Sequence, residues 1–334
     1  MTKIEDILIL TRSELAGLMS LEDYIEGIED AFRKHGQGQS FGTGMLHGET
    51  PGELEFHIKS GGLRLGDRAY FGLKINGSCF SNLKVRGLPN IMGAILLFDG
   101  EYGQPLAIVD SIDPTIKRTG AGTAVALKYL ALPGSRVLTL CGCGNQGRFH
   151  SRFLKAVFPL EQIFAWDQDD IAADTFAAEM QESLGISVSA VSDLATVASQ
   201  SQLIITCTPS KEAFLNQASI SPGTTIAAVG SDSPDKQELD PGLLIKNKVV
   251  VDILAQCAKV GELHHALNTG EMTTEEVYAE IGEIVAGRKL GRENEDEIIV
   301  YDSTGTALQD TAAAALCYEK AKLHNIGQTV NLSE

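Results

Sequence analysis

The chain has 334 residues, of which 43% are hydrophobic, and this length and composition suit two domains with modest cores. Its formal net charge of −17 argues against nucleic acid or an anionic membrane as a main partner, because either would repel the average surface. The first six residues lack the charged-then-apolar order of a secretory signal, and no apolar run approaches the roughly 20 residues that span a bilayer, so we expect a soluble, cytoplasmic protein.

The first third of the chain is predicted to mix helix and strand. Residues 21–35 have the apolar spacing of an amphipathic helix, whereas residues 40–66 are rich in glycine and are expected to be irregular. Alternating apolar residues predict strands over 69–75, 91–98 and 104–109, and a glycine-bearing turn joins the last two as in a hairpin.

From residue 116 onward, helices and strands alternate. A helix of small residues over 116–130 precedes a strand that ends at Cys141. Repeated strand–helix units imply a parallel sheet with helices on both faces, so we expect an α/β fold with a Rossmann-type domain over 116–305. The last helix, 306–324, is expected to return to a first domain made of 1–115 and 306–334. The strands and helices predicted within the parallel domain are strands 162–166, 187–191, 203–206, 225–229, 249–252 and 298–301 and helices 172–184 and 193–199.

The segment after the strand that ends at Cys141 has the pattern G-x-G-x-x-G. Gly142 would permit a tight turn, Gly144 would let the backbone approach a pyrophosphate, and Gly147 would let the following helix pack close to its strand. The alternative is a glycine turn in an ordinary α/β protein. We expect a dinucleotide site here, with Asn145 and Gln146 at the start of the helix.

An acid at the end of the next strand bears on the choice of cofactor. Asp167 follows the predicted strand 162–166 and could accept hydrogen bonds from the ribose hydroxyls, whereas a 2′-phosphate would be repelled. The sequence therefore favours NAD over NADP. Asp169 and Asp170 lie close enough to take this role instead.

Two later strand ends carry polar residues. Asp232 follows an apolar strand and could donate or accept the proton that accompanies hydride transfer, although an acid capping a helix is the alternative. The segment 206–210 could line the nucleotide with hydroxyl groups or form a plain turn.

Two cations stand out in or near apolar segments. Lys74 interrupts a predicted strand and needs an anionic partner if it is buried, either a substrate carboxylate or an ordinary Asp or Glu. Arg118 opens the predicted helix before the glycine loop. It could hold a carboxylate, neutralise a pyrophosphate or lie on the surface.

No metal site is expected. The six cysteines are scattered in mostly apolar runs, as in proteins of a reducing compartment, and Cys141 and Cys143 are interpreted as buried packing residues. The pair His264 and His265 points to different sides of a helix and lacks a visible third ligand.

The chemistry-bearing segments resemble the ornithine cyclodeaminase and mu-crystallin family, over roughly residues 7–327. Within that family, segments 281–287 and 302–310 look most like those of alanine dehydrogenases and imine reductases. The resemblance implies a homodimer, an NAD(P)-binding Rossmann domain, and a substrate and dimerisation domain built from both chain ends. The segments that carry it are Lys74, 87–89, 97–99, 118–121, 142–146, 208–210, 230–240 and 302–305.

The family resemblance also implies roles for individual residues. Asp232 becomes the acid/base beside the reacting carbon, and Lys74 and Arg118 hold the substrate carboxylate, with Lys74 counted among the catalytic residues. Arg118 also lies beside the cofactor. The residues expected to bind the cofactor are Arg118, Thr119, Gly142, Gly144, Asn145, Gln146, Asp167, Thr208, Ser231, Ser303, Thr304 and Gly305.

One segment departs from the family pattern. Members carry an arginine in the strand before that of Lys74, but this chain has none between Arg33 and Arg64. His47, His57 and Lys59 are the candidates to replace it, and we favour Lys59, with a solvent-exposed lysine as the alternative. A cation here would suit a second substrate carboxylate, as in an iminodicarboxylic acid.

We therefore expect an NAD-dependent oxidoreductase that interconverts a 2-amino acid and its 2-imino or 2-oxo acid. A cyclodeaminase that releases ammonia and recycles its NAD is the first alternative. A non-catalytic nucleotide-binding protein of the mu-crystallin type is the second.

Overall fold

The computed structural model describes residues 6–50, 54–79 and 81–332, and its chain forms two compact units. Unit 1 comprises Met1–Arg118 and Thr306–Glu334, and unit 2 comprises Thr119–Gly305, so the division falls inside helix α4 (Ile112–Leu130). The first five residues, over which the sequence predicts no secretory signal, lie outside the described part. None of the helices in that part is long and apolar enough to cross a bilayer.

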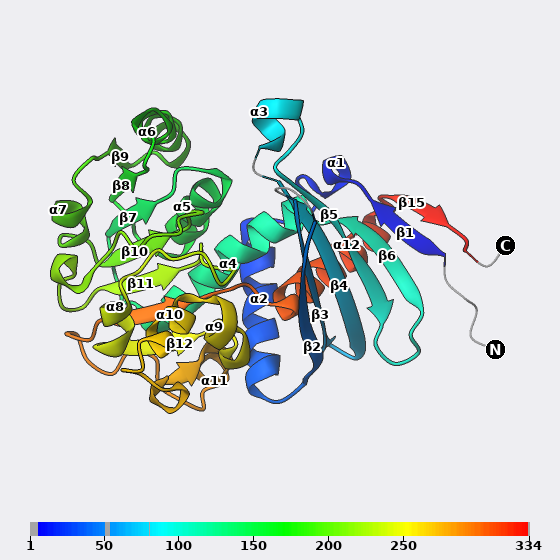
Figure 1. The fold of residues 1–334 in the computed structure, drawn as a ribbon. Coiled ribbons are helices and arrows are strands. Elements are labelled where there is room, and N and C mark those ends of the chain that lie inside the picture. The colour runs from blue at the N-terminus through cyan, green and yellow to red at the C-terminus, as the bar shows by residue number, and fades with distance from the viewer. Residues whose placement is uncertain (1–5, 51–53, 80, 333–334) are drawn as a thin grey trace. The chain divides into compact units, whose positions relative to one another are not determined.

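Unit 1 is built on a seven-stranded mixed sheet in the order β15-β1-β6-β5-β4-β3-β2 (Figure 1). The central strands β2 to β6 pair antiparallel with their neighbours in turn, and the hairpin predicted between β5 and β6 is confirmed. Helix α12 packs against β3 and β4, and α2 packs against α12. The strands are β1 (Ile7–Leu10), β2 (Ser40–Glu49), β3 (Glu55–Leu65), β4 (Arg68–Ser78), β5 (Ile91–Asp99), β6 (Pro105–Asp110) and β15 (Gln328–Val330), and the helices are α1 (Arg12–Leu15), α2 (Leu21–Gly36), α3 (Asn82–Arg86) and α12 (Ala307–His324).

The prediction that residues 40–66 are irregular is wrong, since β2 and β3 form a long antiparallel pair. The glycines of this sheet mark close approaches of other groups. A Cβ on Gly72 would lie 2.2 Å from Oγ1 of Thr311 in α12, and a Cβ on Gly62 would lie 2.2 Å from the ring of Phe41. Glycine therefore lets a helix and an aromatic ring pack directly on the strands.

Unit 2 contains an eight-stranded parallel sheet in the order β13-β12-β14-β11-β10-β7-β8-β9. Its central strands are buried along their whole length, as expected where helices cover both faces of a parallel sheet. The predicted α/β class with a Rossmann-type sheet is confirmed. The strands are β7 (Val137–Cys141), β8 (Gln162–Trp166), β9 (Ser187–Ala190), β10 (Leu203–Thr206), β11 (Thr225–Ala228), β12 (Lys248–Val251), β13 (Ala279–Glu280) and β14 (Ile299–Asp302).

The helices of unit 2 connect these strands. Helix α4, which crosses the unit boundary, begins four residues earlier than the predicted start at residue 116, because Pro114 fits the first helical turn, where its missing N–H has no intrahelical partner to lose. The others are α5 (Asn145–Val157), α6 (Asp170–Leu184), α7 (Leu194–Ala198), α8 (Pro241–Ile245), α9 (Leu254–Val260), α10 (Glu262–Asn268) and α11 (Ile281–Val285), with short 3₁₀ helices at Gln217–Ser219 and Thr274–Glu276.

Candidate active site

The glycine loop joins β7 to α5, and its three glycines differ in what a side chain would meet at each position. Gly142 has a φ of +108°, and a Cβ there would lie 2.8 Å from the carbonyl oxygen of Cys207. A Cβ on Gly147 would lie only 2.3 Å from the carbonyl oxygen of Gly142. Gly144, in contrast, is exposed, and a Cβ there would have no neighbour within 4 Å among the described residues. The fold requires the first and third glycines, and the second borders open space.

The start of α5 suits an anion. Gly144 is its N-cap residue, Asn145 and Gln146 follow, and the first turn contains no acidic residue. The first N–H groups of a helix lack intrahelical acceptors, and the helix dipole adds positive potential there. Residues 142–146 therefore fit a dinucleotide pyrophosphate, with Gly144 leaving room for its close approach.

Asp167 lies beside this loop at the end of β8. One of its carboxylate oxygens accepts a hydrogen bond from the backbone N–H of Cys143 at 2.8 Å, and the other accepts from the N–H of Asp169 at 3.0 Å. Asp169 instead caps α6, through the N–H groups of Ile171 and Ala172. Of the candidate acids, Asp167 is thus the one held against the glycine loop.

A buried carboxylate joins the ends of β10 and β11. Glu238 accepts hydrogen bonds from Oγ1 of Thr206 at 2.7 Å, the N–H of Thr208 at 2.6 Å and the N–H of Gly230 at 2.9 Å. Burial raises the pKa of Glu238, whereas these hydrogen bonds oppose that rise. Glu238 lies in the segment 230–240, which carries the family resemblance, but the sequence alone assigned it no role.

Further buried acids support the neighbouring loops. Asp252 accepts hydrogen bonds from the N–H of Gly305 at 2.7 Å and from the hydroxyls of Ser303 and Thr304. Asp302 accepts from the N–H of Leu263, and burial raises its pKa to about 7. Sequence reasoning missed both acids, although each directly follows or ends an apolar strand.

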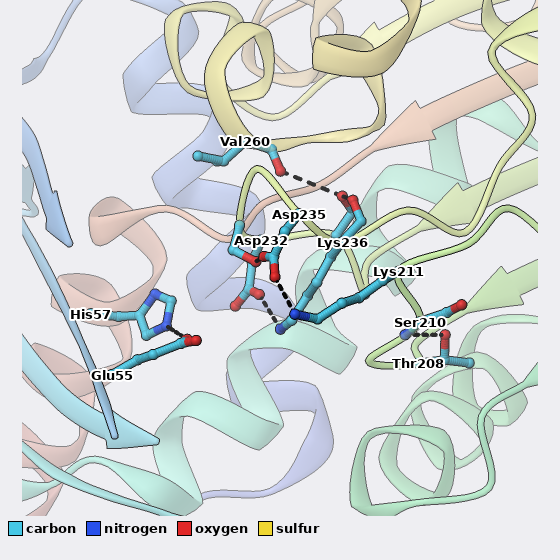
Figure 2. Close-up of polar contacts among 12 residues, drawn as sticks. Glu55, His57, Thr208, Ser210, Lys211, Asp232, Asp235, Lys236 and Val260 are labelled. Carbon is cyan, nitrogen blue, oxygen red and sulfur yellow. Dashed lines mark hydrogen bonds and ion pairs between the residues drawn. The ribbon is translucent and has the colours of Figure 1, made fainter. Parts of the chain in front are cut away.

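The loop after β11 carries Asp232, whose carboxylate forms an ion pair with Lys236 at 2.6 Å (Figure 2). The Asp232 side chain is 39% exposed, so it is accessible to a reactant. Ser231 is buried, and its hydroxyl donates to the carbonyl oxygen of Lys236 at 2.7 Å. The nearby Asp235 pairs with Lys211, which with the Ser233 hydroxyl lowers the pKa of Asp235 to about 2.

Two hydroxyl-bearing candidates have local partners. Oγ1 of Thr208 accepts a hydrogen bond from the N–H of Ser210 at 3.2 Å, so it shapes the turn after β10 (Figure 2). Thr119 lies in α4 and is half-buried, and its carbonyl oxygen accepts from Oγ1 of Thr123. Apart from Thr119, the candidate residues of unit 2 lie at or just after the carboxyl ends of the parallel strands, where ligands bind in open α/β sheets.

Unit 1 contains a separate cluster of buried charges. Nζ of Lys74 lies 2.7 Å from Oδ2 of Asp310, and Nε of Arg118 lies 2.8 Å from Oδ1 of the same carboxylate. Arg118 also donates to Oε1 of Gln309 at 3.1 Å. Burial lowers the pKa of Lys74 to about 7, with Asp310 opposing this effect and Arg118 and Lys59 adding to it.

The burial of this cluster decides between alternatives that the sequence left open for Arg118 and Lys59. Arg118 is 4% exposed and lies within α4, so the surface alternative is wrong. Lys59 is 5% exposed, so the solvent-exposed alternative is wrong for it too. Asp310 was missed as a partner, although an acid in the alanine-rich helix α12 signals a buried charge pair.

The other two replacements for the missing arginine lie on β2 and β3. The His57 ring lies 3.3 Å from a Glu55 carboxylate oxygen (Figure 2) and packs edge-on against His47, with 4.7 Å between ring centroids. His47 is exposed. Of the three candidates, Lys59 therefore lies deepest and acts on the Lys74 and Asp310 pair.

Comparison with known proteins places this arrangement in a family. The model of the ornithine cyclodeaminase/mu-crystallin family matches residues 5–325. An alanine dehydrogenase of Archaeoglobus fulgidus is 37% identical over 328 residues, covering 97% of this chain and 98% of that protein.

Two solved structures resemble the chain closely. An archaeal alanine dehydrogenase dimer with bound NAD gives a TM-score of 0.91 at 36% identity, covering 98% of this chain and 99% of that chain. The iminosuccinate reductase of Paracoccus denitrificans in complex with NAD⁺ gives 0.89 at 30% identity, covering 98% and 100%. The chain therefore belongs to the ornithine cyclodeaminase/mu-crystallin family.

Proposed function

We propose that this protein is an NAD-dependent oxidoreductase that interconverts a 2-amino acid and its 2-imino or 2-oxo acid. The glycine loop carries the proposal, because Gly142 and Gly147 are sterically required while Gly144 borders open space at a helix start. The relatives described above, alanine dehydrogenases and an iminosuccinate reductase, support the same reaction class.

Residues of unit 2 would bind the cofactor, and bound NADH would supply the hydride. The N–H groups at residues 142–146 would hold the pyrophosphate, and Asp167 would accept from the adenosine ribose, which favours NAD over NADP. Thr119, Thr208 and Ser303–Gly305 would line the remainder of the nucleotide, and Ser231 would shape the loop beside it. Buried Glu238 and Asp252 fix those loops, so little reorganisation would be needed on binding.

The substrate would be held by charge. Lys74 and Arg118, already oriented by Asp310, would bind its carboxylate, and Arg118 would also help to neutralise the cofactor. Asp232 would exchange the proton that accompanies reduction of the imine, and its ion pair with Lys236 would orient the carboxylate. The substrate is thus a small 2-amino or 2-aminodicarboxylic acid, or the corresponding imino acid.

A screen of amino acids with NAD, and of 2-oxo acids with ammonium and NADH, tests this function. Asp232→Asn should lower kcat by about 10²- to 10⁴-fold, the usual contribution of a general acid/base, while the Kd for NADH stays within about threefold. Asp235→Asn, a change of a nearby acid in the same loop, should retain activity. Ammonia release from a diamino acid without net NADH formation would instead indicate a cyclodeaminase, and NADH binding without any turnover would indicate a binding protein.

We also propose a homodimer formed through the sheet of unit 1, in the cytoplasm. One face of this sheet is covered by α12, and the opposite face carries apolar side chains of β2 to β6 that are half-buried or partly exposed in the single chain. Exposed apolar patches of this kind mark protein interfaces. The members exposed most strongly are Phe41, Leu46, Phe56, Met92 and Ile108.

A further inference from the structure

The face of β4 that carries Lys74 also carries a buried asparagine. Lys74 and Asn76 are two positions apart on this strand, so their side chains leave the same face of the sheet. They are 3% and 7% exposed, whereas Ile75 between them is half-buried. A rise of about 3.3 Å per residue places the two side chains about 7 Å apart along the strand, so both can reach one small molecule.

The oxygen of the Asn76 amide is held within unit 1. Oδ1 of Asn76 accepts a hydrogen bond from Oγ of Ser111 at 2.6 Å, and Ser111 is fully buried. Gly93, the register partner of Asn76 on β5, leaves room for this contact, because a Cβ there would lie 2.3 Å from Oδ1 of Asn76. Ser111 directly precedes α4, the helix that carries Arg118. The bond to Ser111 therefore orients the amide.

The nitrogen of the same amide is a donor without an acceptor. Among the described residues, Nδ2 of Asn76 has no hydrogen-bond partner, and it is not one of their fully enclosed unsatisfied atoms, so it retains access to a ligand. Polar groups of buried residues are normally hydrogen-bonded, and a desolvated donor without an acceptor is costly. An amide NH₂ offers two donors and no charge, which suits an oxygen acceptor such as a carboxylate.

We infer that Asn76 is a substrate-binding residue, whose amide donates to the carboxylate next to the reacting carbon. This inference rests on the proposed function and adds a neutral contact to the cations of that site. A carboxylate has two oxygens, so one can face the Lys74 ammonium group while the other accepts from Asn76. Every 2-amino, 2-imino and 2-oxo acid has this carboxylate, so Asn76 serves binding whatever the substrate side chain is.

Asn76→Asp tests the inference, because it keeps an acceptor for Ser111 but replaces the donor with a negative charge that repels the substrate. With ammonium and NADH, KM should rise about 10- to 100-fold, the usual scale for losing a hydrogen bond to a charged group. The rise should be alike for each of pyruvate, 2-oxobutyrate and oxaloacetate that the wild type reduces. The kcat should stay within about threefold, since the contact is made equally in the bound substrate and in the transition state.

Two further variants and one measurement complete the experiment. Ser111→Ala, which frees the amide to rotate, should raise KM for the same substrates about three- to tenfold. Asn268→Asp, at an exposed asparagine of unit 2, should match the wild type. The Kd for NADH should be the same in all of these proteins, and urea denaturation shows whether each is folded.

The outcomes separate this inference from the proposed function. An unchanged KM in a folded Asn76→Asp protein, or an equal rise in its Kd for NADH, would overturn the inference and leave the oxidoreductase function intact. A loss confined to substrates with one kind of side chain would also overturn it, because Asn76 would then contact that side chain. If Asn76→Asp fails to fold, Ser111→Ala decides, and an unchanged KM there contradicts the inference. A wild-type protein without nicotinamide turnover on any substrate would refute the proposed function itself.

Discussion

At the scale of single residues, we expect Lys74 to make substrate binding depend on pH. Burial lowers its pKa to about 7, although Asp310 opposes the shift. Only the protonated form can attract a carboxylate, so kcat/KM should fall about tenfold per pH unit above pH 7, while the Kd for NADH stays constant. The check is kcat/KM against pH from 5.5 to 9.5, paired with NADH titrations.

A Lys74→Arg variant provides the control for this assignment. Arginine keeps its charge over the whole range, so its residual activity should show no loss between pH 7 and 9. A wild-type profile that is level from pH 6 to 9 would mean that Lys74 does not bind the substrate as an ammonium group.

At the scale of elements, two glycines in the turn from β7 to α5 have different expected roles. We expect Gly144 to serve NADH binding alone and Gly147 to serve both folding and binding. Gly144→Ala should leave the free energy of unfolding within about 0.5 kcal/mol, because the added methyl group meets open space, but it should weaken NADH binding at least tenfold. Gly147→Ala should lower both the free energy of unfolding and the affinity for NADH, since its Cβ would lie 2.3 Å from the carbonyl oxygen of Gly142. Urea denaturation and NADH fluorescence measure the two effects, and unchanged NADH affinity in Gly144→Ala would contradict the proposed cradle.

The Glu238 carboxylate accepts hydrogen bonds from the ends of both β10 and β11. Glu238→Gln should destabilise the protein by about 1–3 kcal/mol, because an amide NH₂ would then face N–H donors that the carboxylate satisfies. It should also lower kcat, since Gly230 leads directly into the loop of Asp232. Glu212→Gln, at an exposed acid nearby, is the matched control. Equal stability and equal kcat in both variants would remove Glu238 from this role.

The central strands of unit 2 could be predicted because their signals are local, whereas the short helices α8, α9 and α11 were missed. Strand β10 matches the predicted range 203–206, since a buried parallel strand is a short apolar run. Residues 40–66 failed because the glycines there serve contacts with Phe41 and α12, which no local pattern reveals. Strands β1, β13 and β15 were missed because each depends on its sheet neighbours: β1 lies between β6 and β15, and β13 pairs with β12.

In the candidate site, too, the features with a local sequence signal could be predicted and those set by tertiary contacts could not. The glycine loop and the position of Asp167 beside it could be predicted, because their spacing reflects one strand–helix–strand unit, from β7 through α5 to the end of β8. The partner of Arg118 could not, since Asp310 lies 192 positions away and meets it only through the packing of α12. Lys59 was identified through a departure from the family pattern, but its burial required the register of β3 with β4.

At the scale of the whole molecule, the sheet of unit 1 has two unlike faces. The face with Lys59 and Lys74 is covered by α12, whereas Leu46, paired in register with Ile58, leaves the opposite face. Side chains along β4 alternate between buried and half-buried, as expected when only one face is covered within the chain. An apolar second face suits an interface, and in the proposed dimer a second copy would place each exposed residue against an equivalent patch.

Leu46→Lys should dissociate the proposed dimer, because a two-fold interface would bury the new charge twice, once from each subunit. We expect the wild type to sediment at twice the chain mass of 35.7 kDa and the variant to sediment as a monomer at micromolar concentration. Leu290→Lys is the matched control, since Leu290 is 67% exposed in unit 2 and Leu46 is 62% exposed on the open face. If Leu46→Lys remained dimeric while Leu290→Lys did not, the interface would lie in unit 2.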